Sequence, residues 1–129
     1  MIFIKAVIST EKAPAAIGPY SQGTSGAGLV FTSGQLPLDP ATGTFVSGGI
    51  REQTRQSLVN LKHILEQAGA GMDRVLKTTV FLSDMENFAL MNEVYGEFFV
   101  EGQYPSRSAV EVARLPKDAL VEIEAVALV

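Results

Sequence analysis

The sequence predicts an α+β fold with one mixed β-sheet and two helices packed on one of its faces. Two observations support this prediction: strand-like segments occupy both ends of the chain, and two stretches with helical apolar spacing flank one further strand in the middle. With 129 residues, of which 47% are hydrophobic and 19% charged, the chain is long enough to bury one core. We therefore expect a single domain over residues 1–129.

The first part of the chain has strand-like segments separated by turn residues. The predicted strands and extended segments are residues 2–8, 18–24 and 29–36. Gly26 and Gly28 would form the turn before the third of these. A Gly-X-Gly can also belong to a phosphate-binding loop, but no helix follows it here for a phosphate to sit against. A hairpin turn therefore explains these glycines better.

Two helices are predicted in the middle of the chain. Over residues 50–68 apolar side chains recur at helical spacing, and Gly69 is a natural stop. Residues 75–82 are rich in β-branched residues and predict a strand. Residues 83–86 then have capping-box spacing and lead into a second apolar stripe. That stripe consists of Phe88, Met91, Tyr95, Phe98 and Phe99.

Residues 104–125 predict two strands joined by a proline turn at residues 114–118. Because side chains alternate along a strand, Arg107 shares a face with Ala109. The second strand has one apolar face, and its opposite face carries two carboxylates between apolar residues. The residues of that opposite face are Leu120, Glu122, Glu124, Val126 and Leu128. We expect a hairpin that brings Arg107 within a strand or two of Glu122.

Two helices cannot cover both faces of a sheet. The uncovered face would carry apolar residues such as Leu120, Val126 and Leu128, so we expect it to be buried against other subunits. Arg107 and the carboxylates of the second strand would then lie together in a subunit interface, where scarce solvent strengthens charged interactions.

The composition argues against several classes of site. Without cysteine there is no disulfide and no thiolate, and a single histidine makes a metal site unexpected. The net charge of −4 and the absence of a lysine or arginine block argue against a nucleic-acid surface. The N-terminal apolar run is too short for a signal peptide, and no stretch approaches the roughly 20 apolar residues of a membrane helix. We expect a cytoplasmic protein.

The residues by themselves leave the chemistry open. Arg107 could form a plain interface salt bridge, or it could hold a substrate carboxylate through the paired bonds that a guanidinium offers. Glu122 becomes a candidate base only if it shares a cleft with Arg107. Tyr20, Ser33 and Asn92 are neutral hydrogen-bonding residues with no independent signature.

Four motifs together resemble one family. They are GPYSQ at residues 18–22, FTSGQLPLDPATG at 31–43, NLK at 60–62 in a glutamine-containing helix, and PSRSAVEVARLPKDALVEIEA at 105–125. The match covers nearly the whole chain and resembles the RidA family, also called the YjgF family. This resemblance implies a chorismate-mutase-like α+β fold. It also implies a barrel-like homotrimer with the sheets inside, the helices outside and clefts between subunits.

The resemblance also implies an activity that needs no cofactor and no metal. Members of the most similar branch hydrolyse 2-iminobutanoate and 2-iminopropanoate, unstable products of pyridoxal-phosphate dehydratases, to 2-keto acids and ammonia. Carried over to this chain, Arg107 would hold the carboxylate and Glu122 would orient or deprotonate the attacking water. The cleft would be lined by Tyr20, Ser33, Gly34, Asn92 and the backbone of Ala109. Many members have cysteine at the position of Ala109, so a thiol role is lost here while a backbone contact stays possible.

Two other functions fit a trimer of this kind. One is a binding module without turnover, which holds small carboxylates or engages proteins as a chaperone does. The other is a ribonuclease or translation inhibitor, against which the acidic pI near 4.9 weighs. We expect the partners to be a small imino or 2-keto acid and further copies of the chain, with no nucleic acid and no membrane.

Overall fold

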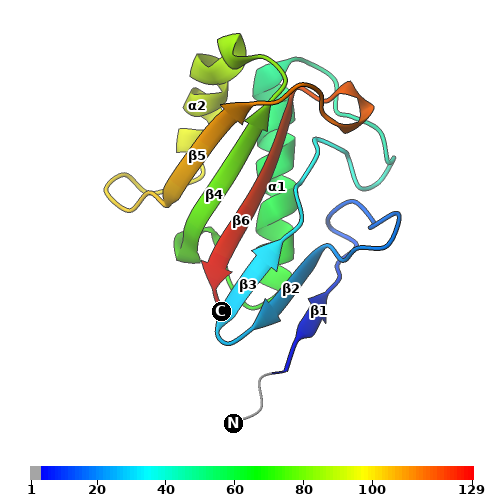
Figure 1. The fold of residues 1–129 in the computed structure, drawn as a ribbon, viewed down its shortest axis with the longest axis vertical. Coiled ribbons are helices and arrows are strands. Elements are labelled where there is room, and N and C mark those ends of the chain that lie inside the picture. Colours follow the sequence, from blue (N-terminus) through cyan, green and yellow to red (C-terminus); the bar gives the residue numbers. More distant parts are fainter. Residues whose placement is uncertain (1–3) are drawn as a thin grey trace.

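The computed structural model describes residues 4–129, and within this range its centre is a six-stranded mixed sheet (Figure 1). The strands are β1 (Ala6–Ile8), β2 (Gly23–Gly26), β3 (Leu29–Thr32), β4 (Val75–Leu82), β5 (Ser106–Glu111) and β6 (Val121–Leu128). Their order in the sheet is β1-β2-β3-β6-β4-β5, with β5 parallel to β4 and the other neighbours antiparallel. The predicted mixed sheet is confirmed. Residues 2 and 3 of the predicted first strand lie outside the described residues.

Helices α1 (Ile50–Gln67) and α2 (Phe88–Gly96) both lie behind the sheet in Figure 1, on one of its faces. α1 begins where the sequence predicts, and the N–H of Gly49 donates to Oε1 of Glu52 at 2.8 Å. A short 3-10 turn precedes α2, and Asp84 caps it by accepting the N–H of Glu86 at 2.9 Å. The prediction of two helices on one sheet face is therefore confirmed.

The core lies between the sheet and the two helices. α1 contributes the predicted apolar stripe, and β6 buries its alternate residues against it. The buried residues of these two elements include Leu58, Leu61, Ile64 and Leu65 on α1 and Val121, Ile123, Ala125 and Ala127 on β6. Burial of one leucine or valine side chain stabilises a fold by about 1.5–3 kcal/mol. The alternation along β6 therefore decides which of its faces turns to the helices.

The predicted hairpin between the last two strands is wrong. β5 and β6 are not neighbours, because β4 lies between them and pairs with both. β4 is rich in β-branched and apolar residues and buries alternate positions, which suits it to an inner place in the sheet. The expected turn does form at Pro116–Asp118. It connects strands that run along the two sides of β4, so Arg107 and Glu122 are one strand apart.

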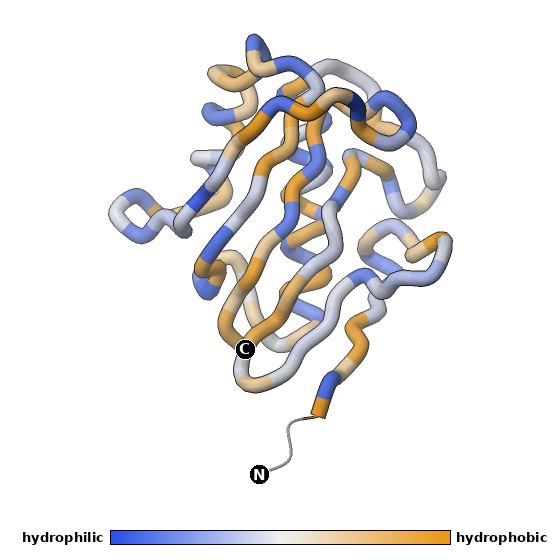
Figure 2. The backbone as a smooth tube through the Cα atoms, in the orientation of Figure 1, coloured by the Kyte–Doolittle hydropathy of each residue, from blue (hydrophilic) through white to orange (hydrophobic). Residues whose placement is uncertain are grey.

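The face of the sheet toward the viewer in Figure 1 has no helix over it. Along β6, hydrophobic and hydrophilic residues alternate in Figure 2, and the hydrophilic ones are the carboxylates of the open face. Exposed apolar side chains also lie on this face, at Phe31 of β3, Val110 of β5 and Leu128 of β6. Leu120 does not belong to it, because this residue precedes β6 and packs against the core. For Leu120 the prediction is wrong.

Candidate functional site

The first group of predicted site residues lies around Glu122 on the open face. Glu122 stands on β6 between the buried Val121 and Ile123, so its side chain points away from the helices. Gly34 lies directly against it, because a Cβ at Gly34 would lie only 2.8 Å from Cδ of Glu122. The N–H of Gln35 donates to the carbonyl of Ile123 at 2.7 Å and holds the two segments at this distance. Because glycine has no side chain, Gly34 leaves the space that the carboxylate of Glu122 occupies.

Ser33 of this group is hydrogen-bonded to residues 21 and 22, which directly follow Tyr20. Oγ of Ser33 donates to the carbonyl of Ser21 at 2.5 Å, and the N–H of Ser33 donates to the carbonyl of Gln22 at 2.8 Å. Tyr20 is exposed, and its hydroxyl accepts a backbone N–H of its own loop at 3.3 Å. Ser33 thus lies next to Gly34, which contacts Glu122, and Tyr20 directly precedes the residues that bind Ser33.

The carboxyl of Glu122 holds its proton more strongly than an ordinary glutamate. Partial burial is the main cause of its raised pKa, and the negative charge of Glu124 on the same face raises this pKa further. Glu122 forms no ion pair within residues 4–129. A raised pKa brings a carboxylate closer to the proton affinity that general-base catalysis at neutral pH requires.

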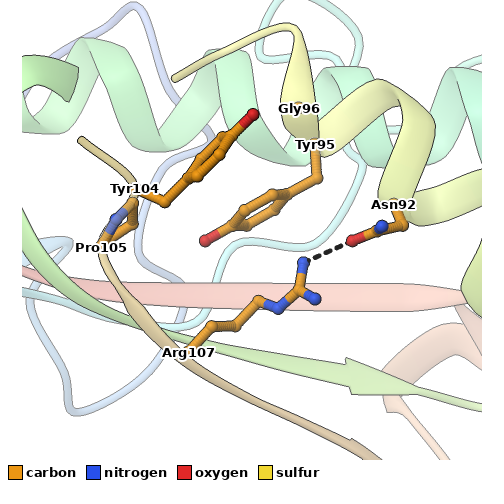
Figure 3. Close-up of a pocket in the computed structure, with 6 residues that line it drawn as sticks. All are labelled: Asn92, Tyr95, Gly96, Tyr104, Pro105 and Arg107. Atoms are coloured by element: carbon orange, nitrogen blue, oxygen red, sulfur yellow. Dashed lines mark hydrogen bonds between the residues drawn. The ribbon is translucent and has the colours of Figure 1, made fainter. Parts of the chain in front are cut away.

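The second group of predicted site residues lies at the β5 edge of the sheet, on the side of the helices (Figure 3). The guanidinium of Arg107 lies over the rings of Tyr95 and Phe88, with Cζ 4.7 and 5.4 Å from their centroids. Its Nη1 donates to Oδ1 of Asn92 at 2.7 Å. All three partners belong to α2, so one helix face receives the arginine.

A pocket of about 470 Å³ adjoins this arginine. It is lined by Asn92, Tyr95, Gly96, Tyr104, Pro105 and Arg107 (Figure 3). The Arg107 guanidinium forms no ion pair within residues 4–129, so its positive charge is not neutralised inside the chain. A free cation beside aromatic walls suits a small molecule that has a negative group and an apolar part.

Ala109 lies two residues farther along β5, and its side chain packs against the core. In a strand, successive peptide groups point alternately to the two edges. The N–H of Val112 donates to the carbonyl of Leu82 of β4 at 2.8 Å. The N–H of Ala109, three residues earlier, therefore points away from β4, toward the edge of the sheet. This is the position that a backbone contact with a ligand would require.

Within one chain, Arg107 and Glu122 lie on opposite faces of the sheet, so the expectation that they share the uncovered face is wrong. Arg107 is paired with Thr78 of β4, which is paired with Ala125 of β6, and all three belong to the helix-covered face. Glu122 is paired with Phe81 and belongs to the open face. The alternation within each strand was predicted correctly, but alternation does not relate the faces of two strands to each other.

Three residues near the two groups were not assigned to a site from the sequence. Tyr95 and Tyr104 line the pocket beside Arg107, and the carbonyl of Gln22 accepts the N–H of Ser33. Tyr95 was interpreted as a core aromatic, and it is indeed buried, but its ring also supports Arg107. One sequence signal was available: Phe88, Asn92 and Tyr95 are spaced by four and three residues, which places them on one helix face. Nothing in the sequence indicated that β5 lies under that face.

The described residues give no sign of a metal centre or of a membrane helix. Residues 4–129 contain no cluster of three metal-binding side chains. Among the same residues, no helix combines the length and the apolar character that crossing a membrane requires.

The fold and the site together define a class: a small α+β protein with an open sheet, an unpaired arginine at one sheet edge and a partly buried glutamate on the open face. Comparison with known proteins identifies the family. The model of the family described as Endoribonuclease L-PSP matches residues 10–129, and the chain belongs to this family. It is the family that the sequence motifs resemble, so the predicted RidA resemblance is confirmed.

Similar proteins agree with this assignment over nearly their whole length. The chain is 53% identical to the 2-iminobutanoate/2-iminopropanoate deaminase of Salmonella typhimurium, across 94% of this chain and 95% of that protein. It is 50% identical to the mouse protein of the same name, across 97% and 92% of the two chains. Among solved structures, Escherichia coli TdcF with bound serine is 49% identical and superposes with a TM-score of 0.91, covering 96% and 98%.

Proposed function

We propose that this protein hydrolyses 2-imino acids, with 2-iminobutanoate and 2-iminopropanoate as substrates, to 2-keto acids and ammonia. The observation that carries the proposal is the unpaired guanidinium of Arg107, which is held at the rim of a pocket by a neutral amide and two aromatic rings. Such a group is ready to bind the carboxylate that every 2-imino acid carries. Relatives at 53% and 50% identity, named deaminases of these two imines, support an enzyme of this class.

The proposed mechanism needs two groups of this chain. Arg107 binds the carboxylate through two parallel N–H···O bonds and thereby orients the C=N carbon. The oxygen of a water molecule attacks that carbon while Glu122 accepts one proton from the water. The C=N double bond becomes a C–N single bond. The nitrogen then takes up the proton from Glu122 and the proton of the new hydroxyl group. The C–N bond breaks with release of ammonia, and the C–O bond becomes the C=O bond of the keto group.

The opposite faces of Arg107 and Glu122 favour a site built from two copies of the chain. The open face with Glu122, Gly34 and Ser33 would meet the β5 edge of a neighbouring subunit, which carries Arg107. In a homotrimer, three such contacts would form three equivalent clefts. Asn92 and the N–H of Ala109 would complete the arginine side of each cleft, and Tyr20 would complete the glutamate side.

The family description would also fit a ribonuclease, but the charge of the chain favours the deaminase. Nucleic-acid surfaces neutralise phosphates with lysine and arginine, whereas this chain has a net charge of −4. The open face also carries the carboxylates of Glu122 and Glu124, which would repel a phosphate backbone. A small substrate with a single carboxylate requires only Arg107.

A coupled assay tests the proposal. A threonine dehydratase generates 2-iminobutanoate, and release of 2-ketobutanoate is followed with and without the protein. Arg107→Ala removes a charge-assisted contact of about 1.5–3 kcal/mol, so kcat/KM should fall at least about tenfold and binding of 2-ketobutanoate should weaken with it. Glu122→Gln should lower turnover by about 10² to 10⁴ while 2-ketobutanoate binding stays within a few-fold.

Glu124→Gln is the matched control, because Glu124 lies on the same strand and the same face as Glu122. It should keep most of the turnover. The parent enzyme should lose activity as the pH falls through the raised pKa of Glu122, because protonation removes the base, and Glu122→Gln should lack this loss. If Arg107→Ala and Glu122→Gln both assemble normally and act at the parent rate, the roles proposed for these two residues are wrong. If the parent protein itself does not accelerate 2-ketobutanoate release, the binding-module function replaces the deaminase.

A further inference from the structure

One face of α2 packs against the guanidinium of Arg107. Phe88, Asn92 and Tyr95 lie along that face, and each contacts the guanidinium. The two rings offer their faces to the cation, which is attracted by the negative potential over an aromatic ring. Asn92 accepts one N–H and sets the rotation of the guanidinium plane. This arrangement uses one side of the group and leaves its other N–H donors free.

Tyr95 is itself fixed from the opposite side. Its side chain is 4% exposed, and its hydroxyl forms a 2.7 Å hydrogen bond with Oγ1 of Thr78, which is fully buried. Thr78 is the residue of β4 that pairs with Arg107 of β5. The strand pair thus holds both the arginine and the threonine that anchors the ring. A ring held in this way cannot move without breaking a buried hydrogen bond.

The phenol of Tyr95 stays neutral at physiological pH. Burial raises its pKa, although the hydrogen bond from Thr78 and the charge of Arg107 act in the opposite direction. A phenolate would neutralise the arginine, whereas a neutral ring attracts the cation and leaves its full charge for a ligand. The contact therefore orients Arg107 without competing for its charge.

We propose that Tyr95, with Phe88, is a positioning residue that holds Arg107 in the orientation in which it binds the substrate carboxylate. The inference rests on the proposed function, because it assigns Arg107 to carboxylate binding. A free arginine side chain has many rotamers, and ordering it during binding costs affinity. When the aromatic rings order it beforehand, that cost is absent at the moment of binding. In this role Tyr95 acts through Arg107, although its ring also lines the pocket.

The test is a double-mutant cycle on the full chain, with the dissociation constant of 2-ketobutanoate measured by calorimetry. Tyr95→Leu should weaken binding about tenfold, since the desolvated cation–π contact that orders Arg107 is lost. Tyr95→Phe keeps the ring and should restore binding to within about threefold of the parent. In the Arg107→Ala background, Tyr95→Leu should change binding less than about twofold, because its partner is gone.

Two outcomes would overturn the positioning role alone, and a third would overturn the carboxylate clamp as well. If Tyr95→Leu binds as tightly as the parent while Arg107→Ala binds weakly, the positioning role is wrong and the deaminase proposal stands. The same holds if Tyr95→Leu weakens binding equally in both backgrounds, because a purely structural effect would do so. If Arg107→Ala binds like the parent, the carboxylate clamp itself is wrong, and the positioning role is overturned with it.

Tyr95 is buried, so Tyr95→Leu could fail to fold. Phe88→Leu takes its place in that case, because Phe88 is only half-buried and its ring lies 5.4 Å from Cζ of Arg107. It should weaken 2-ketobutanoate binding about threefold in the parent and less than about twofold with Arg107→Ala. Equal effects of Phe88→Leu in the two backgrounds, or none in either, overturn the proposal.

Discussion

At the scale of single residues, Gly34 determines where the carboxylate of Glu122 can lie. Its φ is outside the left-handed region, so the backbone itself would accept another residue. The restriction comes from the carboxylate, because an added Cβ would lie 2.8 Å from Cδ and 2.9 Å from Oε2 of Glu122. These distances are below van der Waals contact, and the flexible end of the glutamate is the part that would shift.

We expect Gly34→Ala to fold and to lose turnover. A displacement of about 1 Å in a catalytic group can lower a rate by about 10²-fold, whereas a shifted side-chain end costs little stability. The measurement is the coupled assay beside thermal unfolding. Gly26→Ala is the control, because its added Cβ would meet only a backbone oxygen at an ordinary 3.7 Å. Parent turnover in Gly34→Ala would remove the link between this contact and catalysis.

At the scale of elements, one buried amide holds the connection between β1 and β2. Gln22 is 4% exposed, and its Nε2 donates to the carbonyls of Thr10, Ala13 and Pro14 at 3.0, 3.2 and 2.8 Å. Its Oε1 accepts the N–H of Thr10 at 2.7 Å. Because its own backbone also accepts the N–H of Ser33, this residue ties the first loop to the segment beside Glu122.

Gln22→Ala should lower the free energy of unfolding by about 2–4 kcal/mol, because it leaves several backbone groups of the loop without partners. Arg51→Ala is the contrasting variant. It removes a 2.7 Å ion pair between α1 and Glu93 of α2, but both side chains are at least half exposed. Such a pair contributes about 0.2–1 kcal/mol, and less at high salt. Urea unfolding at one protein concentration compares them, and equal costs would contradict this account.

At the scale of the whole molecule, the open sheet face exposes large apolar side chains. Phe31 is 47% exposed, Val110 42% and Leu128 45%, and they lie on the same face as the half-buried Glu122. Apolar side chains of this size on adjoining strands are typical of a subunit interface. The α2 face toward solvent carries Leu90 as its exposed apolar residue of similar size, at 38%.

We expect a homotrimer in solution, and Leu128→Asp should dissociate it, because a charge on the open face would be buried without a partner. Leu90→Asp, on the opposite side of the molecule, should leave the trimer intact. Sedimentation velocity at micromolar concentration distinguishes the species. A stable monomer of the parent chain would end the trimer proposal, and with it the cleft formed by two subunits.

The sequence by itself determined the two helices and the strands β4 and β6, because each depends on the spacing of residues close together in the chain. It placed β2 and β3 less well, since the predicted segments 18–24 and 29–36 became strands at Gly23–Gly26 and Leu29–Thr32. α1 was predicted over residues 50–68 and ends at Gln67, and β4 was predicted at its observed bounds. The alternation of β6 likewise predicted which of its residues are buried. The spacing of nearby residues indicates which side chains share one face of a helix or strand. The four motifs indicated the family and its expected site residues.

Only the tertiary structure decided how these elements stand beside one another. It placed β4 between β5 and β6, so these two strands form no hairpin. In this register Arg107 and Glu122 lie on opposite faces of the sheet. It also placed α2 over β5, so that the ring of the buried Tyr95 lies against the guanidinium of Arg107. Strand order follows from contacts between residues far apart in the chain, and the alternation within a strand is the same whichever neighbour it has.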